Sequence, residues 1–351
     1  MRNEVDPSSK TQFNKVLIIQ TAFIGDVILS TPIIEKIHKR FPQTQIDFLL
    51  RKGNESLLVD HPHIHKLLIW DKKTGKYKDL LRILGIIRNN RYDVVINLQR
   101  FASTGLLTAL SKAKKTIGFD KNPFSFLFSD KVPHQIGQSM HEVKRNLQLI
   151  SKIVDAAFIP PKLYPSAKDH EAVDQYKMTS YICIAPTSVW FTKQFPIEKW
   201  ISFIDSIPSN ERIYLLGAPS DTEACEKIKT STKHPNIVNL AGKLTLLQSA
   251  ALMKGAVLNY VNDSAPLHMA SAVNANTCAV FCSTVPAFGF YPLANFSEIV
   301  EISTPLDCRP CGLHGYKACP LSHFNCAHKI NNAQLLSVLN KASHARKSRT
   351  E

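Results

Sequence analysis

The chain has 351 residues, of which 43 are Lys or Arg and 28 are Asp or Glu, giving a formal net charge of +15 at pH 7. This length favours two domains over one core, and the charge favours acidic partners such as nucleic acid, anionic lipid or phosphorylated substrates. No apolar run reaches membrane-spanning length and the N-terminal stretch lacks a signal-peptide layout, so we expect a cytoplasmic protein.

The first half of the chain alternates short, branched apolar runs with helical patterns. Four runs are predicted to form strands: Lys15–Gln20, Gln45–Leu50, Lys66–Ile69 and Val94–Asn97. Helical periodicity occupies Ile33–Arg40 and Asp79–Arg88 between them. Strands that alternate with helices indicate right-handed βαβ units and hence a parallel sheet.

The turn after the first strand carries Gly25, Asp26 and Pro32. Neither G-x-G-x-x-G nor G-x-x-x-x-G-K-[ST] occurs in the chain, which disfavours dinucleotide and nucleoside triphosphate binding. Asp26 falls where a helix should begin and is compatible with an N-cap or with a catalytic carboxylate. Pro32 lies several residues inside the apparent helix, and such violations of local rules cluster at functional sites.

A second series of strands follows a proline-rich segment. Three prolines within Phe158–Pro165 interrupt helical and ladder hydrogen bonding, so we place a domain boundary there. The strands predicted beyond it are Tyr181–Ala185, Arg212–Leu216, Ile237–Asn239, Ala256–Tyr260 and Thr277–Phe281. We therefore predict α/β domains at 13–160 and 161–330, with a C-terminal helix and basic tail at 331–351. Two doubly wound, Rossmann-like domains would face each other across a central cleft.

Two loops of the second domain carry groups that suit a nucleotide. Thr187 and Ser188 follow a strand and offer hydroxyls and backbone donors, and Lys193 adds a point charge, a combination that suits a diphosphate. Asp221 follows the next strand and could accept hydrogen bonds from ribose hydroxyls. A solvated loop lysine and an exposed loop carboxylate are the alternatives for Lys193 and Asp221.

Residues 262–270 read as a strand end that turns directly into a helix. Asp263 or Ser264 is expected to cap this helix, and Pro266 favours its opening. Free N–H groups and the helix dipole at such a start favour phosphate, and His268 in the first turn would be close enough to share the ligand. An ordinary capped helix with one chance histidine is the alternative.

Three ordered motifs resemble glycosyltransferase family 9, the heptosyltransferases. They are I-G-D-x-x-x-x-T-P at 24–32, T-K-x-F-P at 192–196 and N-D-S-x-P-x-H at 262–268, and residues 92–99 and 141–146 look similar too. The likeness covers most of Lys15–Ile330. It implies a GT-B fold whose N-terminal domain binds the acceptor and whose C-terminal domain binds a nucleotide-sugar. Ala265 and Phe195 depart from the family, where glycine is frequent and tryptophan usual.

The resemblance also implies roles for individual residues. Asp26 would be the general base, and Lys193 would bind the donor diphosphate. The remaining donor contacts would be Thr187 and Ser188 on the phosphate side, Asp221 on the adenosine side, and Asp263, Ser264, Ala265 and His268 at the helix start.

Inverting sugar transfer needs a carboxylate for the hydroxyl proton and positive groups for the departing diphosphate, and Asp26 and Lys193 supply both. No D-x-D motif suggests a metal-bound diphosphate, so we expect metal-independent transfer without a cofactor. The helix dipole should keep Asp26 ionised.

We therefore predict an inverting transferase that moves heptose from ADP-heptose to the inner core of lipopolysaccharide, with peripheral contact at the inner membrane. Arg100, Arg145 and the basic run Lys72–Lys78 are candidate contacts to the acidic acceptor. One alternative is another nucleotide-sugar and a surface polysaccharide. A second is a non-catalytic basic protein that binds nucleotides or nucleic acid, although aromatic residues do not interleave the basic runs.

A C-terminal loop contains Cys308, Cys311, Cys319 and Cys326. Four thiols could hold zinc, but only the first pair has ligand-like spacing. Reduced structural thiols or oxidation-sensitive pairs are therefore preferred to zinc. The sequence leaves the state of these cysteines, the acceptor hydroxyl and the oligomeric state open.

Overall fold

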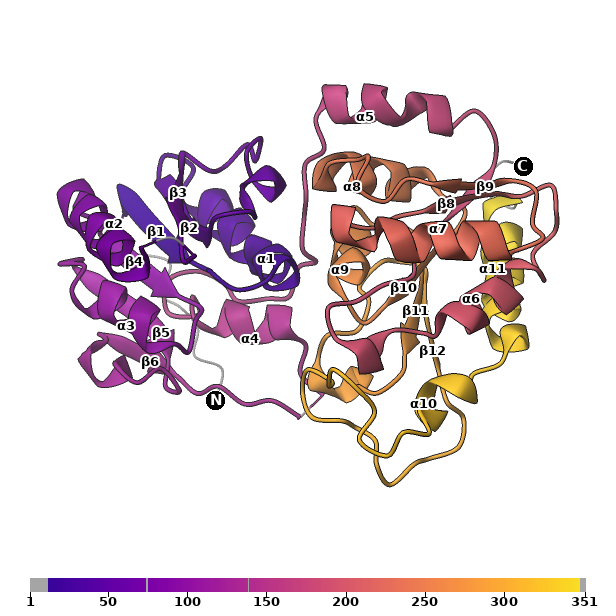
Figure 1. The fold of residues 1–351 in the computed structure, drawn as a ribbon. Coiled ribbons are helices and arrows are strands. Elements are labelled where there is room, and N and C mark those ends of the chain that lie inside the picture. Colours follow the sequence, from indigo (N-terminus) through magenta and orange to yellow (C-terminus); the bar gives the residue numbers. More distant parts are fainter. Residues whose placement is uncertain (1–11, 74, 138, 348–351) are drawn as a thin grey trace. The chain divides into compact units, whose positions relative to one another are not determined.

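The computed structural model describes residues 12–73, 75–137 and 139–347, and these form two compact units that divide between Tyr164 and Pro165. Each unit contains a six-stranded sheet whose paired strands are all parallel, with helices packed around it (Figure 1). None of the helices in these three ranges is long and apolar enough to cross a membrane.

The first unit has the strand order β3-β2-β1-β4-β5-β6. Its elements are β1 (Lys15–Ile19), α1 (Ile24–Arg40), β2 (Gln45–Arg51), η1 (Glu55–Leu57), β3 (Lys66–Trp70), α2 (Lys76–Asn90), β4 (Val94–Asn97), α3 (Ala102–Ala109), β5 (Lys115–Phe119), η2 (Ser125–Leu127), β6 (Asp130–Val132) and α4 (Glu142–Gln148). Strands β1 and β4 lie side by side where the order reverses, and both are almost wholly buried, as expected of central parallel strands.

The second unit repeats this topology with the order β12-β11-β10-β7-β8-β9. Its elements are α5 (Ala167–Val173), η3 (Asp174–Tyr176), β7 (Tyr181–Ala185), η4 (Phe191–Lys193), α6 (Ile197–Ile204), β8 (Arg212–Leu215), η5 (Pro219–Asp221), α7 (Thr222–Ser231), β9 (Ile237–Asn239), α8 (Leu246–Gly255), β10 (Asn259–Asn262), α9 (Ala265–Ala272), β11 (Thr277–Phe281), η6 (Pro286–Phe288), β12 (Ser297–Glu301), α10 (Asn325–His328) and α11 (Asn332–Lys347). Both sheets are doubly wound, which confirms the predicted fold class. The order reverses between β7 and β10, where ligands bind in such sheets.

Helix α1 begins at Ile24, close to Asp26, where the turn residues predicted a helix start, although the periodic pattern marked only Ile33–Arg40. The helix contains Pro32, as predicted. Proline lacks the N–H that would bond the carbonyl of Ile28. The Thr31 hydroxyl donates to that carbonyl at 2.8 Å instead, so the helix continues through the proline. A local side chain therefore supplies the missing hydrogen bond.

Two other boundaries differ from the prediction. The strand expected at 256–260 starts at Asn259, because α8 continues to Gly255. Helix α11 runs from Asn332 to Lys347 and so includes residues that were predicted as basic tail. Residue 74, within the basic run Lys72–Lys78, and residues 348–351 of the predicted basic tail lie outside the described residues.

The segment that ends the first unit is fixed to α1. The Lys162 backbone N–H donates to Thr31 Oγ1 at 2.9 Å, and the Tyr164 hydroxyl donates to Glu35 Oε1 at 2.8 Å. His61 Nε2 lies 3.5 Å from the same Glu35 oxygen. Burial, followed by the charge of His63, lowers the pKa of His61 to about 3, so the imidazole stays neutral in the fold.

This buried imidazole should make the first unit sensitive to acid. As pH falls below the ordinary value of 6.5, the unfolded chain takes up a proton that folded His61 refuses until about pH 3. Stability is therefore complete above pH 6.5 and falls by about 2 kcal/mol between pH 7 and pH 5 from this group alone. His61→Gln should flatten the decline of the thermal midpoint, whereas exposed His344→Gln should leave it unchanged. Equal declines in all three proteins would refute the assignment.

Candidate functional site

The candidate site of the second unit lies at the carboxyl ends of β7 and β10, which pair in parallel at the reversal of strand order. Asn262 is the last residue of β10 and is fully buried. Its amide nitrogen donates to the Pro186 carbonyl at 2.8 Å, and its amide oxygen accepts from the Phe195 N–H at 2.9 Å. One side chain therefore fixes both ends of the loop that carries Lys193.

Lys193 forms a buried ion pair. Its Nζ lies 2.8 Å from Asp263 Oδ2, and the two side chains are only 15% and 7% exposed. The Thr284 hydroxyl donates to the same carboxylate oxygen at 2.6 Å. Because an unpaired ammonium is costly to bury, Asp263 makes this position of Lys193 tenable. The Asp263 carboxylate therefore contacts Lys193, whereas the sequence analysis predicted that Asp263 would contact the donor.

Helix α9 begins immediately beyond this pair. Ser264 occupies the N-cap position, but its side chain makes no cap hydrogen bond, and its hydroxyl lies 3.4 Å from the Asn262 carbonyl instead. The expected side-chain cap by Asp263 or Ser264 is therefore absent. Pro266 has no N–H and the Leu267 N–H donates to the Ser264 carbonyl at 3.1 Å, so the Ser264 and Ala265 N–H groups are the ones at this helix start that can meet an anion. His268 is buried in this first stretch of the helix.

A loop more than one hundred residues downstream supports Lys193. Thr192 Oγ1 accepts from the Tyr316 N–H at 2.8 Å and from the Ser283 hydroxyl at 3.0 Å, and the Thr192 N–H donates to the Tyr316 carbonyl at 3.1 Å. Gly315 has φ +76°, and a Cβ there would lie 2.8 Å from Thr192 Oγ1 and 3.0 Å from Lys193 Cγ. Sequence reasoning missed these contacts, since its only signal was the threonine of the T-K-x-F-P motif.

The packing at Gly315 gives a direct test of this support. Gly315→Ala should displace the Lys193 turn and strain the left-handed backbone, which costs about 1 kcal/mol or more. We expect a lower thermal midpoint and a several-fold loss of ADP affinity by calorimetry. Gly53 also has a positive φ of +99°, but a Cβ added there would meet no atom within 4 Å. Gly53→Ala is therefore the matched control for backbone strain. Unchanged ADP affinity in Gly315→Ala would contradict the supporting role.

The other predicted donor residues occupy the same edge of the second sheet. Thr187 and Ser188 are half-buried in the loop after β7, where the Ser188 carbonyl accepts from Gln194 Nε2 at 2.6 Å. Asp221 follows β8, the neighbour of β7. Its carboxylate accepts from the Ala218 N–H at 2.7 Å and so shapes its own turn. Ala265 is the first residue of α9.

Asp26 lies in the first unit, at the third position of α1 rather than at its N-cap, which is Phe23. Its Oδ2 accepts from the Phe23 N–H at 3.1 Å. Burial and then the charge of Glu142 raise the pKa of Asp26 to about 6, against the lowering effect of the backbone hydrogen bonds. The sequence interpretation expected the helix start to favour ionisation, but desolvation dominates here.

The burial of Arg145 contradicts its predicted role as an acceptor contact. It is 1% exposed, and its Nε and Nη2 both lie 2.7 Å from Glu142 Oε2. The side chain therefore serves the interior of the first unit and offers no open surface to an acceptor. Asn146 in the same helix donates to the Leu29 carbonyl at 3.2 Å, which holds α4 against α1. Arg100, the other candidate contact, is exposed after β4.

All eight cysteines are free thiols. Cys308 Sγ lies 3.9 Å from His323 Nε2, while Cys326 is buried. Within the described ranges, no group of three or more His, Cys, Asp or Glu side chains is arranged to hold a metal ion. The same loop provides the Tyr316 contacts to Thr192 described above.

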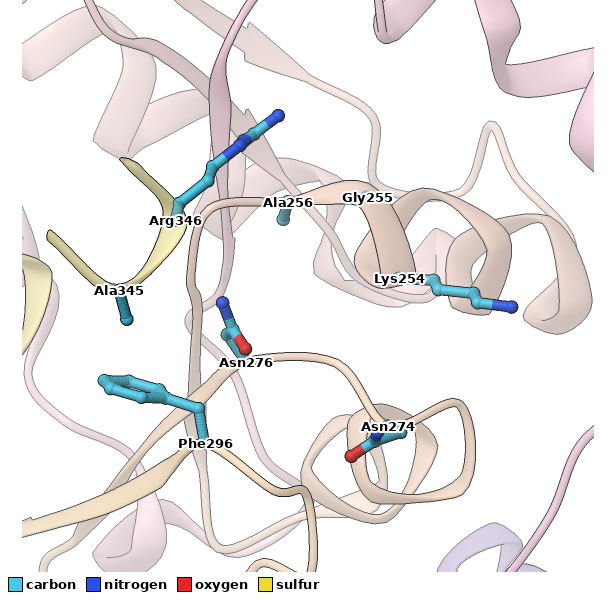
Figure 2. Close-up of a pocket in the computed structure, with 8 residues that line it drawn as sticks. All are labelled: Lys254, Gly255, Ala256, Asn274, Asn276, Phe296, Ala345 and Arg346. Atoms are coloured by element: carbon cyan, nitrogen blue, oxygen red, sulfur yellow. The ribbon is translucent and has the colours of Figure 1, made fainter. Parts of the chain in front are cut away.

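A cavity of about 300 Å³ lies elsewhere in the second unit (Figure 2). Its walls include Ala256, Asn276 and Phe296, which precede β10, β11 and β12, together with Lys254 and Arg346. It therefore sits at the amino ends of these strands, opposite the edge that carries Lys193. Ligands of doubly wound sheets bind at the carboxyl ends, so this cavity is not the candidate donor site.

The two doubly wound units together have the GT-B architecture that glycosyltransferases use. The family model described as glycosyltransferase family 9 (heptosyltransferase) matches residues 80–314. Lipopolysaccharide heptosyltransferase 3 of Escherichia coli is 30% identical over 284 residues, which cover 75% of this chain and 82% of that protein. The chain belongs to glycosyltransferase family 9, as its motifs predicted.

Solved structures show the same fold. Escherichia coli ADP-heptose lps heptosyltransferase II matches with a TM-score of 0.78 at 20% identity, covering 95% of this chain and 99% of that one. The glycosyl transferase family 9 protein from Veillonella parvula matches with a TM-score of 0.82 at 18% identity, covering 94% and 97%.

Proposed function

We propose that this protein transfers heptose from ADP-heptose to the inner core of lipopolysaccharide, with inversion at the anomeric carbon. The observation that carries the proposal is the buried Lys193–Asp263 pair beside the uncapped start of α9. In a member of family 9, a fixed lysine and the N–H groups of Ser264 and Ala265 at this sheet edge suit a donor diphosphate.

In this mechanism the second unit binds the donor. Lys193 and the first turn of α9, at Ser264 and Ala265, contact the diphosphate and offset the negative charge that grows as it departs. Asp263 acts through Lys193 by holding its ammonium in place. Thr187, Ser188 and His268 line the phosphate and sugar, and Asp221 lies toward the adenosine.

Asp26 acts as the general base. It removes the proton of the acceptor hydroxyl while that oxygen bonds to the anomeric carbon and the bond to the ADP oxygen breaks. A pKa of about 6 makes Asp26 a stronger base than an ordinary carboxylate while leaving it largely ionised at neutral pH. The positive charge of Lys193 and the helix start suits transfer without a metal ion, and added chelator should leave the rate unchanged.

The acceptor is proposed to bind the first unit and to be presented at a membrane surface. Its phosphates would contact exposed Arg100, which makes no ion pair with any residue of the described ranges. Arg145 is left out of this role because its guanidinium is buried against Glu142.

The base assignment predicts a defined pH profile. Below about pH 6, kcat/KM should fall about tenfold per pH unit as Asp26 is protonated. Asp26→Asn should lower kcat by about 10²- to 10⁴-fold without weakening ADP binding by the second unit. Exposed Asp60→Asn is the control and should behave as the wild type. Near-normal transfer by Asp26→Asn would exclude Asp26 as the base.

Glu142 should help to set the pH below which kcat/KM falls, here called the acid limb of the profile. Glu142→Gln keeps a hydrogen-bond acceptor for Arg145 but removes the charge that helps to raise the pKa of Asp26. The limb of kcat/KM should therefore move to lower pH, although burial keeps it above that of a free carboxylate. Exposed Glu171→Gln is the control. An unmoved limb in Glu142→Gln would show that the two carboxylates do not interact.

A further inference from the structure

Large apolar side chains are exposed along one edge of the first sheet. Phe23, Phe101, Phe126 and Leu127 are 54%, 62%, 69% and 53% exposed. Phe23 follows β1, Phe101 follows β4, and the other two lie in η2 after β5. Strands β1, β4 and β5 are consecutive neighbours in a parallel sheet, so the loops after them share its carboxyl edge. These four residues are here called the apolar rim.

Hydrogen bonds hold part of the rim together. Asn122 is buried, and its amide nitrogen donates to the Gln99 and Phe101 carbonyls at 2.9 and 3.1 Å. Its amide oxygen accepts from the Phe124 N–H at 3.0 Å, at the start of η2. Helix α3 and η2 are therefore adjacent, as their contacts also show. Phe101 and Phe126 project from two loops that one side chain ties together.

Positive charge surrounds the rim. The Arg51 guanidinium lies 4.7 Å from the centre of the Phe23 ring. Arg100, Lys121 and Lys131 are exposed and make no ion pair within the described part of the chain. Two nearby carboxylates already have partners. Asp120 accepts from the His134 N–H at 3.0 Å, and Asp130 pairs with Lys115 and Lys152 at 2.8 and 2.7 Å.

We propose that the apolar rim inserts into the surface of an anionic lipid bilayer, with Arg100, Lys121 and Lys131 against the lipid headgroups. Exposed aromatic and aliphatic side chains ringed by cations are typical of interfacial binding, where apolar burial and attraction to anionic lipid add together. An anionic bilayer matches both the apolar and the cationic character of this edge. Membrane binding at this edge rests on the proposed function, because it would bring the enzyme to a glycolipid acceptor that resides in such a surface.

Vesicle co-sedimentation tests this surface directly. The full-length protein should sediment with phosphatidylglycerol vesicles, bind phosphatidylcholine vesicles much more weakly, and lose binding as salt is raised. The variant Phe101→Ser/Phe126→Ser/Leu127→Ser should bind the anionic vesicles about tenfold less tightly or worse. A matched variant, Phe158→Ser/Met178→Ser, removes exposed apolar residues that lie outside the rim and should bind as the wild type does.

Two further measurements separate this inference from the proposed function. Thermal midpoints must match among the three proteins, and a single Phe126→Ser variant replaces the triple variant if that one is unstable. Transfer to a water-soluble, deacylated acceptor should be equal in wild type and rim variants. Loss of vesicle binding with intact transfer supports the inference, whereas absent transfer in every protein refutes only the proposed function. Equal vesicle binding by wild type and rim variant, or binding only to vesicles that contain the acceptor glycolipid, would overturn the inference.

Discussion

The ion pair of Lys193 and Asp263 is the interaction on which the candidate donor site depends. An ammonium group this deeply buried would be expensive without a partner, and its place is fixed from three sides. Asn262 closes the loop that carries Lys193, and the Thr284 hydroxyl donates a hydrogen bond to Asp263. The Tyr316 backbone hydrogen-bonds to Thr192, the residue before Lys193. The result is a preorganised cation at the start of α9, which is what a departing diphosphate requires.

In the first unit, burial raises the pKa of a carboxylate. There an acidic group is moved out of water, and the nearby negative charge of Glu142 adds to the effect, so Asp26 becomes more basic than a free carboxylate. Arg145 neutralises Glu142 through two contacts to one oxygen and so limits that effect. This chain thus holds a buried lysine–carboxylate pair in one doubly wound unit and a carboxylate of raised pKa in the other.

Much of the fold follows from local patterns, because buried parallel strands read as short apolar runs and the motif residues fall at their ends. The turn residues predicted the start of α1 near Asp26, but apolar periodicity marked only Ile33–Arg40. Periodicity does not reveal that Thr31 replaces the hydrogen bond that Pro32 cannot make. Arg145 looked like an acceptor contact because burial is not visible in sequence, although Glu142 three residues earlier was a usable signal. The support of Lys193 by Gly315 and Tyr316 is a tertiary contact between distant segments, so no local pattern could predict it.

Calorimetric titration of ADP-heptose tests the central claim most directly. Lys193→Ala should weaken donor binding at least about tenfold, since a charge-assisted contact to phosphate contributes roughly 1.5–3 kcal/mol. It should also lower the thermal midpoint without unfolding the protein, because Asp263 is left buried without its partner. Lys199→Ala, which removes a half-buried lysine from nearby α6, should bind as the wild type does. Equal donor affinity in Lys193→Ala and wild type would contradict the assignment of this edge of the second sheet as the diphosphate site.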